Sequence, residues 1–346
     1  NLSNRNVVLP LITLKEYYNN IGDIEELVNV TIEDPNYIRS FSGTEHMNAQ
    51  DITKLKTLCS KQNMVFKMKY TKKEFGRYWS HGHSLQNIRS KFRRILLQGE
   101  YNDLDIVNAL PNILINVCSF YKIDCTALQM YVDNREKILS KMIDGFSCTR
   151  DQAKELMIRT LMGGSVKKAI QEYNLQFNKH IRNTTIPFLE GLSNEIKCVN
   201  KELSQTEMYK KCLSFVESLK KNKRKLYIES SVLSLYCQEI ECRIMSKAIE
   251  YLNSKDVNVL SLIHDGCIVP SLDNADNVCI ELQNYIYQEL GLVIQFKSKS
   301  TEMTEEDKAW LEKTKEFVDQ EDCETTYQMC KEYHENERGL CWIMKD

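Results

Sequence analysis

Two aspartates set inside apolar segments constrain this 346-residue chain more than any other feature of its sequence. Asp105 and Asp265 lie far apart along the chain, each in a segment rich in leucine, isoleucine and valine. Between them, a helical pattern carries Arg150 and Lys154 one turn apart. Because carboxylates suit divalent metals and cations suit a triphosphate, this order predicts a magnesium-dependent phosphoryl-transfer site.

The segment around Asp265 predicts a β-hairpin over residues 257–269. Two apolar runs meet across His264, Asp265 and Gly266, and we expect Gly266 to take a left-handed turn conformation. Such a tip holds a carboxylate rigidly on a sheet. Because Asp-Gly is a common hairpin pair, an ordinary turn is the alternative interpretation. His264 is either a core histidine or a group that orients a phosphate or Asp265.

The segment around Asp105 predicts a strand over residues 101–107, followed by a helix over residues 112–121. A carboxylate at the end of a strand, next to a backbone carbonyl at Ile106, suits octahedral Mg²⁺. The alternative is an N-cap for the helix that follows. Asp103 is the local competitor for the ligand role, although its neighbours are more polar.

The helical pattern between the aspartates places Arg150, Lys154, Ile158 and Met162 at every fourth position. These residues follow one side of a helix, so two cations and then two apolar groups suit a nucleotide's phosphates and base. Glycines after Met162 end or kink this helix. The alternative is a solvated helix end whose cations face water.

A stretch that mixes aromatic, amide and cationic side chains precedes the first predicted strand. Arg77, Gln86 and Asn87 lie in it, and Arg93 and Arg94 follow. Aromatic groups stack on bases, amides reach base edges and cations neutralise phosphates, so we interpret this stretch as a nucleic-acid contact. A surface loop followed by a basic helix is the alternative.

In combination, these segments resemble the motifs of the family A DNA polymerases over residues 75–270. The matching positions are Gly76, Arg77, Leu85, Gln86, Asn87, Ile88 and Arg93 upstream, Asp105 in motif A, Arg150, Lys154 and Gly163 in motif B, and His264 and Asp265 in motif C. A family glutamine on the helix before motif C is matched by Gln238. The run from Asp105 to Pro111 also resembles the first motif of family B, but His-Asp-Gly disagrees with that family's last motif.

The chain departs from the family A pattern at four positions. Ile158 and Met162 replace the aromatic residue and the tyrosine of motif B, Leu110 replaces the motif A glutamate that screens out ribose, and Gly266 replaces the second acid of motif C. This compact, divergent form resembles the transposon/virophage polymerase branch (TV-Pol), which is found ahead of a superfamily 3 helicase. Residues 326–335 weakly resemble the stretch that leads into such helicases.

The resemblance implies a helix-rich α+β fold, a right-hand polymerase with an antiparallel-sheet palm and helical fingers. The expected divisions are residues 1–74 as a thumb-like or accessory region, 75–120 as the template- and primer-contacting segment and first part of the palm, 121–229 as helical fingers, 230–303 as the palm with the His-Asp hairpin, and 304–346 as a charged helical linker. In the fingers we expect breaks between helices near Gly145, Gly163, Pro187 and Gly191. We also expect a long helix over residues 230–253, a helix over 276–290 and a last strand over 292–297.

The resemblance also implies the site residues and two Mg²⁺ ions, with Mn²⁺ as a substitute. The expected catalytic residues are Asp105, Asp265 and Lys154, and the expected metal ligands are Asp105, Asp265 and Ile106. The expected nucleotide-binding residues are Arg150, Lys154, Ile158, Met162, Leu110, Asn108 and His264. The expected nucleic-acid contacts are Arg77, Gln86, Asn87, Arg93, Arg94 and Gln238. The expected partners are a DNA template and primer, dNTPs or NTPs, and a superfamily 3 helicase domain in the same polypeptide.

The implied activity is DNA-directed DNA synthesis in viral or mobile-element replication, with primer synthesis as an open option. Loss of the glutamate gate favours entry of ribonucleotides, whereas the bulk of Leu110 opposes a 2′-hydroxyl. Two hypotheses of other classes stay open. One is a catalytically silent platform that binds nucleic acid and recruits a helicase, and the other is a two-metal nuclease that uses the same acids.

Composition sets broader limits on the chain. The net charge is only −2, so nucleic acid would bind a local basic channel rather than a basic body. No apolar run approaches the ~18 residues of a membrane span. The 13 cysteines follow no framework spacing, which indicates free thiols in a reducing compartment, such as host-cell cytoplasm or a viral replication site. We interpret Cys323, Cys330, His334 and Cys341 as unrelated helix residues, with a zinc site as the alternative.

Overall fold

The computed structural model describes the two segments that carry the aspartates and most of the chain between them. The described residues are 70–80, 85–87, 93, 94, 97, 101–173, 175, 181, 183–219, 228–302 and 304–309. The possible zinc ligands, the N-terminal region before Tyr70 and the helicase-like stretch lie outside them. No helix of the described residues is long and apolar enough to cross a membrane.

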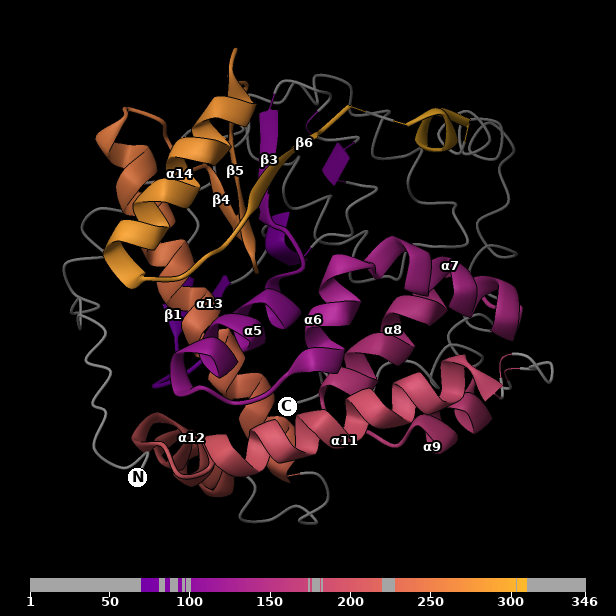
Figure 1. The fold of residues 1–346 in the computed structure, drawn as a ribbon. Coiled ribbons are helices and arrows are strands. Elements are labelled where there is room, and N and C mark those ends of the chain that lie inside the picture. The colour runs from indigo at the N-terminus through magenta and orange to yellow at the C-terminus, as the bar shows by residue number, and fades with distance from the viewer. Residues whose placement is uncertain are drawn as a thin grey trace, which may run out of the picture.

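A four-stranded antiparallel sheet forms one side of the molecule (Figure 1). Its strands are β3 (Tyr101–Ile106), β4 (Ser261–Ile263), β5 (Gly266–Pro270) and β6 (Phe296–Ser300), in the order β4-β5-β3-β6. The two strands at the centre, β3 and β5, therefore come from distant parts of the sequence. This pairing brings the segments of the two aspartates side by side.

Two helices lie beside the sheet (Figure 1). The first is α13 (Ile228–Ser254), and the second is α14 (Ala275–Leu290), which contacts both α13 and β6. Apolar residues occur around the whole circumference of α13, and most of its second half is buried. A helix with buried residues on so many sides lies inside the protein, and α13 contacts α5, α12 and α14.

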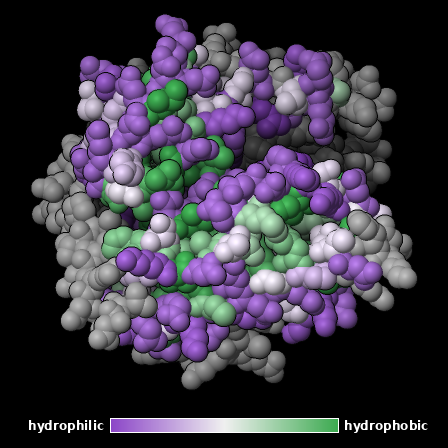
Figure 2. Space-filling view, viewed as in Figure 1, coloured by the Kyte–Doolittle hydropathy of each residue, from purple (hydrophilic) through white to green (hydrophobic). Residues whose placement is uncertain are grey.

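A second group of helices forms a lobe beside the sheet (Figure 1). It contains α5 (Ala109–Tyr121), α6 (Thr126–Asp133), α7 (Arg135–Phe146), α8 (Arg150–Leu161), α9 (Val166–Glu172), α11 (Thr185–Leu203) and α12 (Glu207–Leu219). Contacts with α5 and α12 join this lobe to α13, which contacts α14 beside the sheet. In the same view, apolar residues gather where the two parts meet, and hydrophilic residues cover most of the rim (Figure 2).

A small two-stranded sheet, β1 (Tyr70–Lys72) and β2 (Tyr78–Ser80), precedes the 3₁₀ helix η2 (Leu85–Asn87). Tyr70 fixes this segment to the main sheet, because its hydroxyl lies 3.0 Å from the Ser261 hydroxyl and accepts a 3.1 Å hydrogen bond from the Leu262 amide. The segment with the expected nucleic-acid contacts thus lies against the edge strand β4.

The predicted helix-rich α+β class with an antiparallel sheet is confirmed. The long helix and the helix α14 also agree with the sequence, within two residues at each end. The hairpin is present, but its first strand begins at Ser261, four residues later than predicted. The division near Gly145 is confirmed at the end of α7, and the one near Gly163 follows α8.

Four local predictions are wrong. Helix α5 begins at Ala109, before Pro111, and α11 runs through Pro187 and Gly191. Proline fits the first turn of a helix because its missing N–H would have no partner there. The last strand begins at Phe296 rather than residue 292. In the hairpin, the residue with left-handed backbone is His264 (φ 51°), not Gly266.

Candidate active site

The two predicted metal-binding aspartates lie at one end of the paired strands β3 and β5. Asp105 is directly opposite Gly266, the residue after Asp265. The Ile106 amide donates a 3.0 Å hydrogen bond to the Asp265 carbonyl, which fixes the hairpin turn against the end of β3. The structure therefore brings Asp105, Ile106, His264 and Asp265 together.

Proximity of the acids changes their protonation. Burial, and then the charges of Asp105 and Glu241, raise the pKa of Asp265 to about 7. Burial and the charge of Asp105 also raise the pKa of Asp103. Crowded, partly buried carboxylates resist simultaneous ionisation unless a cation joins them. Their oxygens are the donors that Mg²⁺ prefers, so the donor set fits that ion.

The protein would supply few metal ligands. Among the described residues, no group of three or more histidine, cysteine, aspartate or glutamate side chains is arranged to hold a metal ion. A metal bound to Asp105 and Asp265 would take its other ligands from backbone oxygens, water and substrate phosphates. Mg²⁺ commonly binds proteins in this way, through one or two carboxylates.

Gly266 explains the missing second acid of motif C. A Cβ atom added at this glycine would lie 2.6 Å from the Leu104 carbonyl oxygen and 2.9 Å from Asp105 Oδ1. Both distances are shorter than real Cβ contacts, so any side chain would push against the backbone and carboxylate of β3. The absence of a side chain at Gly266 lets Asp105 approach the hairpin closely.

His264 is a neutral side chain beside the acids. Burial, with the charges of Arg77 and Arg93, lowers its pKa to about 4. Its ring lies edge-on to Trp79, with the ring centroids 5.5 Å apart. Its buried Nδ1 has no hydrogen-bond partner in the described part of the chain, and this nitrogen therefore suits a hydrogen bond with a ligand.

Lys299 on β6 forms an ion pair with Asp105 Oδ2. In the sheet it lies opposite Asp103. Burial lowers its pKa, but the hydrogen bond to Asp105 and the charges of Asp105 and Asp103 outweigh burial and raise the pKa overall. Lys299 was not predicted from the sequence, because a lysine near a strand end usually indicates only solvent exposure.

Glu241 was also missed by the sequence analysis. Its two carboxylate oxygens bind Nε and Nη2 of Arg77, the latter at 2.7 Å. The Glu241 side chain is 3% exposed, and its charge contributes to the raised pKa of Asp265. An acid in a helix that is apolar all round was the available signal, because such a helix is buried and its charges need partners.

Two other expected nucleic-acid contacts, Gln238 and Gln86, form hydrogen bonds within the protein. Gln238 donates a 3.1 Å hydrogen bond to Ser234, on its own helix. Gln86 is buried, donates to the Tyr78 carbonyl at 3.0 Å and accepts from the Ser80 amide at 2.9 Å. Those bonds give Gln86 a structural role.

The remaining expected nucleic-acid contacts that precede β3 are Asn87, Arg93 and Arg94. Arg94 binds Asp307 through two nitrogens, at 2.7 and 2.9 Å. Arg93 is largely buried, which lowers its pKa, while the charges of Asp103 and Asp105 oppose that shift. Asn87 lies in η2, and its side chain is outside the described part of the structure.

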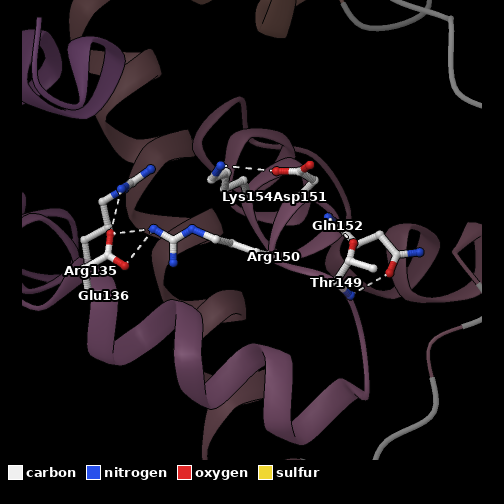
Figure 3. A network of polar contacts seen from close by, with 7 residues as sticks. All are labelled: Arg135, Glu136, Thr149, Arg150, Asp151, Gln152 and Lys154. Atoms are coloured by element: carbon white, nitrogen blue, oxygen red, sulfur yellow. Dashed lines mark hydrogen bonds and ion pairs between the residues drawn. The ribbon is translucent and has the colours of Figure 1, made fainter. Parts of the chain in front are cut away.

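Arg150 and Lys154 lie on α8, which packs on α7, α9 and α11 rather than in the sheet. Figure 3 shows Arg150 paired with Glu136, 2.7 Å apart, and Lys154 paired with Asp151, 3.2 Å apart. A capping box of Thr149 and Gln152 fixes the start of the helix. Both cations are partly exposed, so these pairs would exchange readily with an anion.

The remaining expected nucleotide contacts lie on α8 and at the start of α5. Ile158 is 48% exposed on α8, and Met162 is the residue at the C-terminal end of that helix. Leu110 is half-buried in the first turn of α5. Asn108 precedes that helix with a left-handed backbone (φ 47°), two residues after the end of β3.

The class of fold follows from a comparison with solved structures. The chain is similar to the POL domain of Pol1 from M. smegmatis, solved in complex with DNA primer-template and dNTP. The TM-score is 0.50 at 14% identity, and the match covers 73% of this chain and 52% of that one. The protein therefore has a polymerase-like fold.

A relative is found in the Sputnik virophage. The chain is 27% identical over 228 residues to its protein named "Putative helicase V13". The match covers 65% of this chain but 28% of the virophage protein, so the chain corresponds to a minor part of its relative's length. No family model matches the chain.

Proposed function

We propose that this protein is a template-directed nucleotidyltransferase, a DNA polymerase that acts by two-metal phosphoryl transfer. The observation that carries the proposal is the meeting of Asp105 and Asp265 on paired strands of a polymerase-like fold. In this proposal, Asp105, Asp265 and the Ile106 carbonyl hold two Mg²⁺ ions, with Mn²⁺ as a substitute. Bound metal would lower the pKa of a primer 3′-hydroxyl and stabilise charge on the leaving pyrophosphate.

The residues of α8 bind the incoming nucleotide in this proposal. Arg150 and Lys154 leave Glu136 and Asp151 to bind the β- and γ-phosphates, where their charge offsets charge that develops during transfer. Lys154 is the cation assigned to catalysis. Ile158 and Met162 border the nascent base pair in place of the family's aromatic residues.

The residues around the aspartates contact the primer, template and sugar. Arg77 and Gln238 approach the primer terminus. His264 offers its unpartnered nitrogen to the nucleotide, and Leu110, with Asn108, faces the sugar. We assign DNA synthesis as the main activity, with primer synthesis from NTPs as an additional activity to test.

The similarity to the virophage protein supports a role in viral or mobile-element DNA replication. We propose that the polymerase acts together with a superfamily 3 helicase domain of the same polypeptide, as in the TV-Pol branch. A reducing intracellular site, such as a viral replication site or the host cytoplasm, fits this role.

A catalytically silent DNA-binding platform is the second candidate. The ion pair of Lys299 with Asp105 favours it, because a lysine already neutralises one proposed metal ligand. In that case the nucleic acid binds, but neither aspartate is needed.

A gel assay of primer extension separates these two functions. The chain is incubated with Mg²⁺, primed or unprimed single-stranded DNA, and dNTPs or NTPs in separate reactions. We expect Asp265→Asn to lower extension at least about 10³-fold, since it removes a charged metal ligand. The matched control is Asp273→Asn, an exposed aspartate after β5, which should extend normally. DNA binding without extension in the wild type would support the silent platform instead.

A further inference from the structure

Lys299 holds a position that a metal ion would need. Its ammonium contacts Asp105 Oδ2, while Asp105 Oδ1 faces the backbone of Gly266. Both oxygens of the Asp105 carboxylate therefore lie close to other atoms of the protein. A divalent cation that coordinates Asp105 must share or displace the contact with Lys299, because two cations repel each other across one carboxylate.

Lys299 is also better able to move than Arg77. The Lys299 side chain is 52% exposed and has a flexible stem, whereas both Nε and Nη2 of Arg77 are bound to buried Glu241. Removal of Arg77 from its partner would leave a buried carboxylate without a counter-charge, which costs several kcal/mol. When Lys299 moves into water, the Asp105 carboxylate becomes available to the incoming metal.

A purely structural role explains the contact of Lys299 with Asp105 less well than a role in the acidic site does. Ion pairs that involve an exposed lysine typically contribute about 0–1 kcal/mol to stability. The same contact has a larger electrostatic effect on the site, since Lys299 lies opposite Asp103 and is influenced by the charges of Asp103, Asp105 and Asp265. The lysine thus acts on the whole acidic cluster that would attract a metal.

We propose that Lys299 is an internal counter-ion that competes with divalent metal for Asp105 and thereby sets the metal affinity of the site. The inference rests on the proposed two-metal function and deepens it. Without metal, Lys299 neutralises Asp105. When metal binds, Lys299 turns outward, where its charge is available to a phosphate. Weak binding in the absence of nucleotide follows, because the metal must first displace the lysine.

The test measures metal binding directly, without turnover. Mn²⁺ binding to the full 346-residue chain is followed by electron paramagnetic resonance, and Mg²⁺ binding by calorimetry. Lys299→Gln removes the competing charge, and Lys299→Arg keeps it. Lys141→Gln is the control, since Lys141 is an exposed lysine on α7, which contacts α6 and α8 rather than the sheet. Circular dichroism checks that each variant is folded.

We expect Lys299→Gln to bind Mn²⁺ about 10-fold more tightly than the wild type, a size typical of coupling between two ligands. Lys299→Arg and Lys141→Gln should stay within about twofold of the wild type. If the wild type binds metal and Lys299→Gln binds it equally or more weakly, Lys299 is not a competitor, and the proposed polymerase function stands. If Mn²⁺ binds neither the wild type nor Lys299→Gln, both the competition and the two-metal proposal are wrong.

Discussion

At the scale of a single residue, Asp265 would couple proton release to metal binding in the proposed two-metal site. Burial and neighbouring acids raise its pKa to about 7, so it is largely ionised at pH 8 and largely protonated at pH 6. A metal that binds below pH 7 must release this proton, and its affinity then falls as pH falls.

We therefore expect Mg²⁺ affinity to decrease about tenfold between pH 8 and pH 6, since each pH unit below a ligand's pKa costs about a factor of ten. Calorimetry in two buffers of different ionisation enthalpy measures both affinity and proton release. Asp265→Asn should lose most of the binding at both pH values. Equal wild-type affinity at pH 6 and pH 8 would contradict the raised pKa.

The bidentate pair of Arg77 and Glu241 stabilises the fold at the same scale. Glu241→Gln leaves the largely buried guanidinium without a counter-charge, and we expect a loss of about 3–5 kcal/mol in the free energy of unfolding. The double variant Arg77→Met/Glu241→Met should recover much of that loss, because it buries no unpaired charge. Urea denaturation of Arg77→Met, Glu241→Met and the double variant measures the coupling between the two residues. Additive losses would show that the pair is not coupled.

Sequence patterns could identify some residues of this site but not others. Asp105 and Asp265 stand out because a charge inside an apolar run is costly without a purpose. Glu241 and Lys299 resemble ordinary charged residues locally. Their significance depends on which distant groups lie opposite them, namely Arg77 across the fold and Asp105 across the sheet. Local periodicity carries no such information.

At the scale of an element, helix α8 carries the two cations that we propose to bind the nucleotide phosphates. Its capping box stabilises the helix start, while Arg150 and Lys154 make exposed ion pairs that contribute little. The cations are therefore available for a ligand.

We expect Arg150→Ala and Lys154→Ala each to raise the KM for dNTP at least about tenfold, which corresponds to loss of ~1.4 kcal/mol of phosphate binding. Their unfolding free energies should change by less than about 1 kcal/mol. Lys141→Ala, at an exposed lysine of α7, is the control and should leave KM unchanged. A large loss of stability with unchanged KM would make these residues structural. Steady-state kinetics and urea denaturation supply the two measurements.

Element types were easier to predict than element boundaries. The hairpin, α13 and α14 have strong periodic or turn signals, and the structure confirms them. Pro111 and Pro187 were wrongly placed outside helices, because proline is tolerated in a first turn as well as in a loop. The left-handed residue of the hairpin is His264, whereas Gly266 is needed there because only a residue without a side chain fits against β3.

At the scale of the whole molecule, one hydrophobic core extends from the sheet through α13 into the helical lobe. The resemblance of the ordered motifs to those of family A DNA polymerases implied the fold class. The packing of α13 against α5, α12 and α14 was not predictable, because a helix that is apolar all round does not indicate which neighbour covers which side.

This shared core predicts that the sheet and the helical lobe unfold together. Ile244 of α13 is fully buried, and Ile244→Ala should lower the free energy of unfolding by about 2–5 kcal/mol. Hydrogen exchange followed by mass spectrometry should show an equal loss of protection in β3, β5, α8 and α11. Ile280→Ala is the matched control, because Ile280 on α14 is 53% exposed and its truncation should change stability by no more than about 0.5 kcal/mol. If only the sheet or only the lobe loses protection, the two parts unfold independently and α13 does not couple them.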